Sequence, residues 1–168
     1  MLETIINING NNAVDSYLRG FVDRLTHMSP LMDDIASMVL AQTDDRFASG
    51  GPDPAGSPWK QSVSPNSARV RTLEVSGALR RSFRSVRHGN NSVSIGTDIE
   101  YAAIHQFGGR TAAHIIRPRN KKALKTPYGI FKKVNHPGSV IPARPFLGLS
   151  ADNSTDIIGI INNYIAQR

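Results

Sequence analysis

The spacing of apolar residues divides the first third of the chain into two predicted helices. One face of a helix needs apolar residues at steps of three and four, and the first such set is Val14, Tyr17, Leu18, Phe21, Val22 and Leu25. The spacing returns after Ser29 and Pro30, which we interpret as an N-cap followed by a proline at the first helical position. The second set is Leu31, Ile35, Met38, Val39 and Phe47. We expect this helix to end at "SGG" (49–51), and the loosely alternating "MLETIINI" at the start of the chain predicts a short strand.

The next region combines a loop, a short helix and a hairpin. "GPDPAGSPW" (51–59) holds too many Pro and Gly for a regular element and predicts a loop, from which Trp59 folds back onto the core. After the polar residues 60–72, "TLEVSGALRRSF" predicts a short helix with Leu73 and Leu79 inward and three arginines outward, Arg80, Arg81 and Arg84. "SFRSVR" and "SVSIG" predict a hairpin around "HGNN", because Gly and Asn tolerate positive φ.

The remainder of the chain predicts a short helix, a long basic hairpin and a closing helix. "DIEYAAIHQF" is a helix ended by Gly108. "AHIIRPRNKKALKT" and "YGIFKKVN" predict the two strands of a hairpin that projects over about residues 113–134, with its tip near "TPYG". "PARPF" is extended, and "DIIGIINNYIAQR" is an amphipathic helix. The predicted fold is α+β, with N-terminal helices, antiparallel β-hairpins and a C-terminal helix in a single domain of residues 1–168.

Length and composition narrow the class of protein. A chain of 168 residues can bury one core without covalent staples. It has no cysteine, which excludes a disulfide framework, a thiolate zinc site and a cysteine nucleophile. No apolar run approaches the roughly 20 residues of a membrane span, and the N-terminus lacks the pattern of a secretory signal. We expect a protein that is soluble in the cytoplasm where it is made.

The net charge of +7 is unevenly distributed. Residues 1–57 hold three arginines against eight acidic residues, a balance of −5, whereas residues 58–133 hold fifteen basic and three acidic residues, a balance of +12. A concentrated positive field favours a phosphate backbone or an acidic protein partner. The alternative is a solvated basic face that only aids solubility.

His105 is the leading catalytic candidate, and its sequence surroundings argue against that role. A general base needs a positioned partner, and neither Asp98 nor Glu100 lies three or four residues from it. The histidines share no metal-ligand spacing: His27, His88, His105, His114 and His136. Nucleophile-elbow, Walker and dinucleotide motifs are absent, and the basic region has few carboxylates for a metal-dependent nuclease. We therefore predict no catalytic, metal or cofactor site and no enzymatic activity.

Two segments and the basic hairpin carry the predicted assembly residues instead. "YAAIHQFGG" (101–109) offers one face to the core and one to a neighbour. In "IPARPFLGLS" (141–150) the prolines hold the backbone extended and present Arg144 stiffly to a bidentate partner, while Phe146 and Leu147 fill the core. The candidate interface residues are Tyr101, His105, Gln106, Arg117, Arg119, Lys121, Lys122, Lys132, Lys133 and Arg144.

These segments resemble, in order, those of the virion morphogenesis proteins of contractile-tailed bacteriophages, the tail completion family of Mu-like phages. The matching stretches are "PLMDDIA", "RF" with the loop that ends in Trp59, "SGALRRSF", "IGT" followed by "YAAIHQFGG", and "IPARPFLGLS". The last two form a specific pair at this separation. One departure is "GGPDPAGSPW", which is rearranged from the simpler Pro-Asp-Gly-x-x-Trp form.

The resemblance implies a non-enzymatic protein of the virion neck or tail that completes the tail or joins head to tail. Related proteins form rings, commonly of six subunits, around the DNA channel. The implied partners are other copies of the chain, neighbouring proteins such as the tail terminator and head connector, and DNA in the channel, without a membrane or a cofactor. The alternative is a stand-alone nucleic-acid-binding protein that uses the basic hairpin, although Tyr128 and Phe131 are the hairpin's only aromatic residues.

Overall fold

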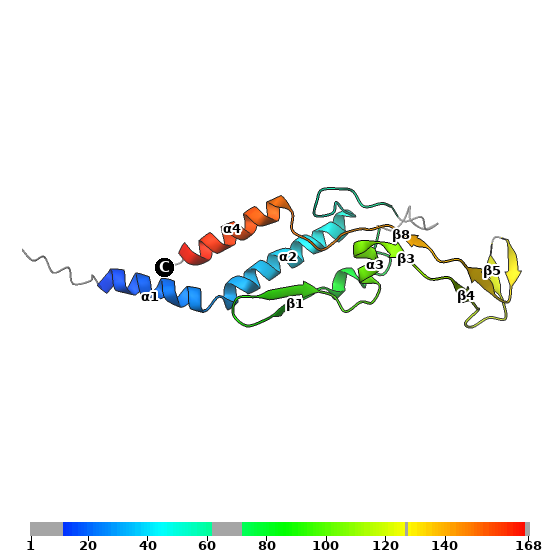
Figure 1. Cartoon of the computed structure of the whole chain (residues 1–168), viewed down its shortest axis with the longest axis horizontal. Helices are drawn as coiled ribbons and strands as arrows, with labels where there is room; N and C mark the ends of the chain where they lie inside the picture. The colour runs from blue at the N-terminus through cyan, green and yellow to red at the C-terminus, as the bar shows by residue number, and fades with distance from the viewer. Residues whose placement is uncertain (1–11, 62–71, 127, 167–168) are drawn as a thin grey trace, which may run out of the picture. The chain divides into compact units, whose positions relative to one another are not determined.

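The structure is a computed structural model that describes residues 12–61, 72–126 and 128–166. It confirms the α+β fold: along the sequence, helices come near both ends, and short antiparallel strand pairs with one short helix come between them (elements labelled in Figure 1). The chain forms two compact units, which we describe separately. Unit 1 comprises residues 1–45, 83–96 and 149–168, and unit 2 comprises residues 46–82 and 97–148. The strand predicted for "MLETIINI" lies outside the described residues.

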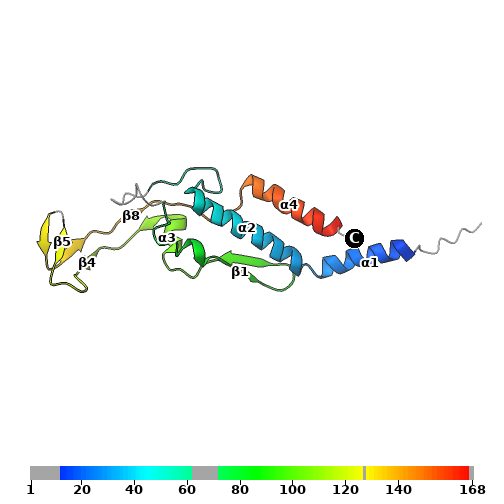
Figure 2. The same cartoon turned by 180° about the vertical axis from the view of Figure 1, so that it is seen from behind.

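Unit 1 is built from helices and one hairpin. Its elements are α1 (Asn12–Thr26), most of α2 (Ser29–Ser49), β1 (Arg84–Arg87), β2 (Val93–Gly96) and α4 (Ala151–Ala166). These agree with the predicted helices and with the hairpin around "HGNN", in which Gly89 has a φ of 68°. In both Figure 1 and Figure 2, α4 and the β1–β2 hairpin lie beside α2. Gln42 of α2 donates to Asp156 of α4, and Arg87 of β1 is paired with Asp33 of α2.

The two ends of α2 show how local sequence sets a helix boundary. Met32 N donates to Met28 O at 3.0 Å, so Met28 is the N-cap and Ser29 is the first helical residue. The predicted cap at Ser29 is therefore wrong by one position. The Ser29 hydroxyl donates to Asn90 Oδ1. At the other end Gly50 has a φ of 77°, Gly50 N donates to Phe47 O and Gly51 N donates to Arg46 O. These two bonds form a Schellman motif, which confirms the predicted stop.

Packing in unit 1 leaves most of α1 uncovered. The Tyr164 hydroxyl of α4 donates to His27 O at 2.6 Å, just after the end of α1. No residue of α1 is buried, however, and the predicted apolar face stays largely exposed: Val14 53%, Leu18 53%, Val22 60%.

α4 starts with a reciprocal cap, in which Asn153 N donates to Ser150 Oγ and Ser150 N donates to Asn153 Oδ1. It therefore begins five residues earlier than the predicted stretch from Asp156.

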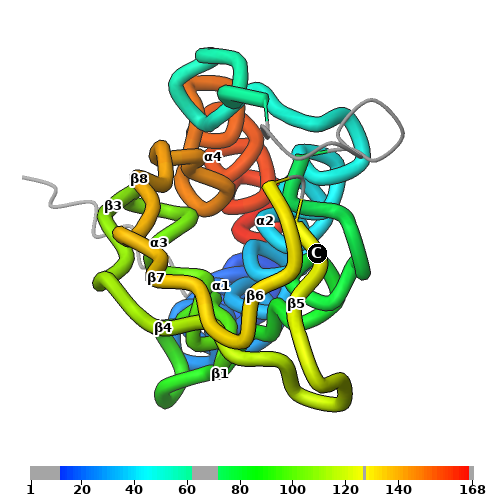
Figure 3. The backbone as a smooth tube through the Cα atoms, turned by 90° about the vertical axis from the view of Figure 1, so that its right-hand side faces the viewer, coloured from blue at the N-terminus to red at the C-terminus, as the bar shows by residue number. Residues whose placement is uncertain are grey.

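Besides the last turn of α2, unit 2 combines two short helical elements with small strand pairs. Its helices are the 3₁₀ turn η1 (Arg80–Ser82) and α3 (Ala102–Phe107), and its first pair joins β3 (Gly109–Arg110) to β8 (Val140–Ile141). The second joins β4 (His114–Ile116) to β7 (Val134–His136), and the third joins β5 (Leu124–Thr126) to β6 (Gly129–Phe131). The chain runs from β3 through β4 to β5 and back (Figure 1), and Figure 3 shows β5 and β6 side by side. We call residues 114–136 the arm.

The helix predicted for residues 72–83 does not form. Leu73 has a φ of 67° and Gly77 a φ of 65°, which place both in the left-handed region. The Arg81 guanidinium folds back to donate to Ser76 O, and Arg80 forms an ion pair with Glu74 instead of pointing outward. Within residues 72–83 only η1 is helical. Leu79 is buried as predicted.

Three aromatic rings form the core of unit 2. The centroid of Phe47 lies 5.5 Å from that of Trp59, in an edge-on arrangement, and 5.4 Å from that of Phe146. Trp59 is 6% exposed, and its indole Nε1 donates to Pro145 O at 2.9 Å. Arg46 Nη1 donates to Phe146 O at 3.1 Å. The prediction that Trp59 folds back onto the core is confirmed, and the rings tie the loop after α2 to the segment around Phe146.

Candidate functional site

The two segments singled out by the sequence lie against each other in unit 2. α3 spans most of the first segment, and the second, after β8, has no regular element around Arg144. The side-chain amide of Gln106 bonds to the backbone of the second segment. Its Oε1 accepts from Phe146 N at 2.9 Å and from Leu147 N at 3.1 Å, and its Nε2 donates to Leu147 O at 2.8 Å. One helical side chain therefore holds the extended segment in place.

Backbone contacts complete the junction between α3 and the extended segment after β8. Arg144 N donates to His105 O at 2.7 Å, and Gly109 and Arg110 pair with Ile141 and Val140. The approach is close because of Gly108, which has a φ of 73°: a Cβ at this position would lie 2.8 Å from Ala143 N. Only a residue without a side chain fits such a contact at positive φ. The predicted glycine stop of this helix is thus confirmed, although ψ is 175° and not left-handed helical.

Arg144 is buried in unit 2, with 5% of its surface exposed. Its Nε donates to Lys60 O at 2.6 Å and its Nη2 to Gln61 O at 3.4 Å. Burial lowers the pKa of the guanidinium from its ordinary value, because low-dielectric surroundings disfavour the charged form. Two donors of the guanidinium, which the sequence analysis expected to face a bidentate partner, therefore already bind main-chain carbonyls within unit 2.

His105 is half-buried beside Arg144 and Tyr101. The Tyr101 and His105 rings meet edge-on, with centroids 6.0 Å apart. Burial, and secondly the charge of Arg144, lower the pKa of His105, which favours the neutral imidazole. Within the described residues its Nδ1 has no hydrogen-bond partner. A general base needs a partner that orients it, so this environment favours a packing role for His105.

The other predicted interface residues lie on the arm and are exposed: Arg117, Arg119, Lys121, Lys122, Lys132 and Lys133. Apolar side chains accompany them, with Tyr128 91% and Ile130 72% exposed. The structure therefore separates the ten candidates into two groups. Four lie on the two paired segments, where Tyr101, His105 and Arg144 line one pocket and Gln106 bonds to the backbone of Leu147. The six basic residues lie on the arm. Their role in assembly stays a prediction for both groups.

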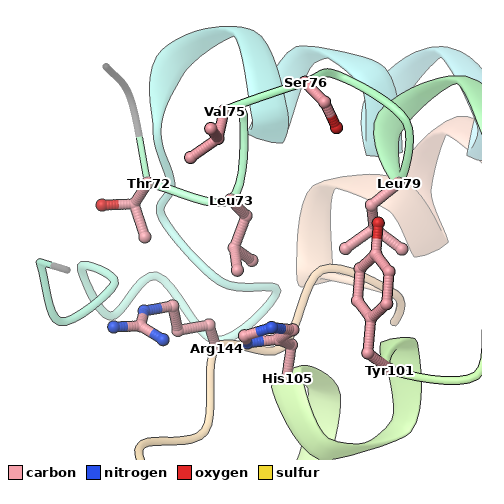
Figure 4. Close-up of a pocket in the computed structure, with 8 residues that line it drawn as sticks. All are labelled: Thr72, Leu73, Val75, Ser76, Leu79, Tyr101, His105 and Arg144. Atoms are coloured by element: carbon pink, nitrogen blue, oxygen red, sulfur yellow. The ribbon is translucent and has the colours of Figure 1, made fainter. Parts of the chain in front are cut away.

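The pocket beside Arg144 has a volume of about 200 Å³. Arg144, His105 and Tyr101 lie along one side of it, and Thr72, Leu73 and Val75 lie opposite (Figure 4). Sequence reasoning missed the residues from 72 to 79, because it assigned them to a helix. It also missed the backbone acceptors Lys60 and Gln61, since main-chain carbonyls leave no sequence signature.

A second feature that the sequence analysis did not find lies on the arm. His114 of β4 and His136 of β7 are register partners, and their rings stack with centroids 5.0 Å apart. In the part of the chain that the structure describes, no group of three or more His, Cys, Asp or Glu residues is placed to hold a metal ion. Nor does any helix there have the length and apolar character needed to cross a membrane.

Comparisons with known proteins place most of the chain in one family. Residues 10–166 match the phage virion morphogenesis family. The chain is also similar to a protein of Haemophilus influenzae, Mu-like prophage FluMu G protein 2, with 29% identity over 160 residues that cover 95% of this chain and 94% of the relative. No solved structure matches.

Proposed function

Because this chain belongs to the phage virion morphogenesis family, whose members are structural proteins of virion assembly, we propose that it completes the tail or joins head to tail. In this role it assembles as a ring, of six subunits, around the channel through which DNA passes. The observation that carries the proposal is the family match over residues 10–166, which covers most of unit 1 and all of unit 2. The protein acts by binding and not by catalysis.

The surface of the chain supports self-assembly. Exposed apolar residues that gather on one face mark binding surfaces more often than isolated ones do, and two elements carry such residues. On α1 they are Val14, Leu18, Val22 and Leu25, and on the arm they are Ile115, Tyr128 and Ile130. A ring needs two different surfaces on each subunit, which bind head to tail. We assign one surface to α1 and the other to the arm.

Charge supports the same assignment. The described helices α1 and α2 carry exposed aspartates, including Asp15 and Asp34, while the arm carries seven Lys or Arg residues. Opposite charge on two surfaces steers their encounter and disfavours pairing of like surfaces. The arm of one subunit would then contact the helices of the next, and arm residues that face the channel would contact DNA through its phosphates. Tail terminator and head connector proteins are the proposed neighbours.

A nonsense mutation in the gene of the parent phage tests the proposal. Without the protein, we expect complete heads and tails that remain unjoined, or tails that lack their end structure, when lysates are viewed by electron microscopy. Mass measurement of the protein bound to tails should give a closed ring. Joined, infectious particles in the absence of the protein would overturn the proposal.

A role as a stand-alone DNA-binding protein is the second candidate, and the basic arm is the observation that favours it. Binding through phosphates weakens steeply as the salt concentration rises. Micromolar or tighter binding of the isolated protein to DNA at physiological salt would favour this candidate. Weak, non-specific binding together with ring formation would favour the structural role.

A further inference from the structure

Arg144 is a buried cation for which unit 2 supplies no carboxylate. Unit 2 contains four acidic residues: Asp53, Glu74, Asp98 and Glu100. Asp53 accepts from the backbone of Ala55 and Ser57, and Glu74 is paired with Arg80. Asp98 and Glu100 are exposed, and residues 62–71 contain neither Asp nor Glu. Buried charges are normally paired, because an unpaired charge in a low-dielectric interior is costly.

The hydrogen bonds of Arg144 leave capacity for a ligand. A guanidinium has five N–H donors. The described residues provide two acceptors, the carbonyls of Lys60 and Gln61, and both are neutral. They hold the side chain in one orientation but do not balance its charge. Arginine binds carboxylates with two parallel hydrogen bonds, which is a strong form of charge-assisted bond.

The pocket beside Arg144 matches a small anion with an apolar stem. Its volume is about 200 Å³. The apolar residues Leu73 and Val75 form a wall opposite Arg144 and His105, and Leu79 lies beside Tyr101 (Figure 4). His105 favours its neutral form here, so it offers a hydrogen-bonding nitrogen without a second full charge. A carboxylate on a hydrocarbon stem satisfies both sides of the pocket, whereas inorganic phosphate would leave the apolar wall uncovered.

We propose that this pocket binds a carboxylate, with Arg144 as its counter-ion and with Leu73 and Leu79 covering its apolar stem. The carboxylate has two sources. One is an acidic side chain on a second copy of this chain, where exposed aspartates such as Asp15 and Asp34 lie on helices. The other is a free small carboxylate. The first source rests on the proposed ring, and the second does not.

Nuclear magnetic resonance of the full-length protein tests the pocket directly. Butyrate and its neutral isostere butyramide are titrated at constant ionic strength while the Nε–H resonance of Arg144 is followed. We expect a saturable shift with butyrate and none with butyramide, because only the carboxylate can pair with the guanidinium. Equal shifts with both compounds, or no saturable shift with butyrate, would overturn the proposal.

Variants show whether the binding depends on Arg144. Read from the Tyr101 ring resonances, butyrate binding should weaken roughly tenfold or more in Arg144→Gln, since a charge-assisted bond is lost. The matched control is Arg110→Gln, which removes an exposed arginine of the same unit and should leave binding unchanged. If Arg144→Gln does not fold, the comparison of butyrate with butyramide in the native protein decides the question. Unchanged binding in a folded Arg144→Gln variant contradicts the proposal.

Sedimentation of the assembled protein separates the two sources of the carboxylate. If a second copy supplies it, both butyrate and Arg144→Gln should shift the assembly toward monomer. If the carboxylate is free, the assembly should be unaffected although butyrate still binds to the monomer. If the ring proposal is wrong and the pocket proposal is right, the protein should sediment as a monomer at all concentrations, and butyrate should still shift the Arg144 resonance.

Discussion

Gln106 and Leu147 are joined by a reciprocal pair of hydrogen bonds across 41 residues of sequence. Leu147 N donates to Gln106 Oε1 at 3.1 Å, and Gln106 Nε2 donates to Leu147 O at 2.8 Å. The side-chain amide thus pairs with the extended segment as a neighbouring strand would. With the bond from Phe146 N, both acceptor positions of Oε1 are used.

Replacing Gln106 with glutamate should break this junction. The Gln106→Glu change replaces the Nε2 donor with an oxygen that faces the carbonyl of Leu147, so one bond is lost and two oxygens meet. We expect unfolding free energy to fall by about 1–3 kcal/mol in denaturant titrations. Asn91→Asp, an exposed amide in the β1–β2 turn, makes the same charge change and should stay within about 0.5 kcal/mol. A similar cost for both variants would contradict the role of Gln106.

Trp59 provides a test of the aromatic core. Trp59→Ala removes the contacts with Phe47 and should cost about 3–5 kcal/mol, as for other buried large-to-small changes. Trp59→Phe keeps a ring but leaves Pro145 O without its donor, and should cost about 1–3 kcal/mol. Because the chain has one tryptophan, fluorescence reports this site alone. Iodide quenching as efficient as that of free tryptophan would show that the ring is not buried.

Gly108 tests the close approach between α3 and the segment after β8. Gly108→Ala adds a Cβ 2.8 Å from Ala143 N, in a residue with a φ of 73°. Gly89→Ala is the matched control, because its φ is 68° but no atom lies within 4 Å of the added Cβ. The unfolding free energy of the control should fall by about 1–2 kcal/mol from backbone strain alone. That of Gly108→Ala should fall further, because the added Cβ also meets Ala143 N. Equal losses in thermal melting would show that the approach is not tight.

The pH dependence of stability tests the environment of His105. Its pKa is lowered from the ordinary 6.5, so the unfolded chain takes up this proton at higher pH than the folded protein does. Its contribution to the unfolding free energy is therefore constant above about pH 6.5 and decreases as the pH falls from there toward the lowered pKa. His105→Gln should remove this decrease while the other four histidines contribute equally to both proteins. Identical pH profiles for the two proteins would contradict the shift.

The same variant tests whether His105 has a chemical role. We expect His105→Gln to fold and to give largely infectious particles, because its neighbours in the pocket form a packed environment and not a catalytic pair. Infectivity, the amount of the protein in purified particles and its melting temperature are the measurements. Complete loss of infectivity, with folding and incorporation intact, would restore the chemical interpretation.

The basic arm should act in assembly and not in folding. Lys121, Lys122, Lys132 and Lys133 are exposed, so replacing all four with Gln should leave the melting temperature nearly unchanged and reduce the yield of joined particles. Like charges on neighbouring strands are unfavourable without a partner or open solvent. A smaller comparison removes two positive charges from each variant: Lys132→Gln with Lys133→Gln on the arm, against Arg84→Gln with Arg110→Gln, two exposed arginines outside the arm and α1. Normal particle yield from the folded arm variants would show that the charge only aids solubility.

Local sequence alone determined the elements whose causes lie within a few residues. The apolar spacing of α1 and α2, the two glycines after Phe47 and the "HGNN" turn each specify a structure through neighbouring φ angles and nearby hydrogen bonds. The segments that identify the family were also visible, because they are short and ordered along the chain. These features depend on steric preference and periodicity, which act over one or two turns.

Tertiary structure decided what the candidate residues contact. The sequence analysis predicts a helix that includes residues 72–79, but the bond from Arg81 to Ser76 O and the φ of Leu73 place them in turns beside a pocket. The sequence predicts that Arg144, held between two prolines, is presented to a bidentate partner. In the structure it is buried, and the carbonyls of Lys60 and Gln61, more than 80 residues away, accept two of its donors. Main-chain acceptors are present at every residue, so their pairing with Arg144 or Gln106 depends on which segments the fold brings together. No local pattern encodes that choice.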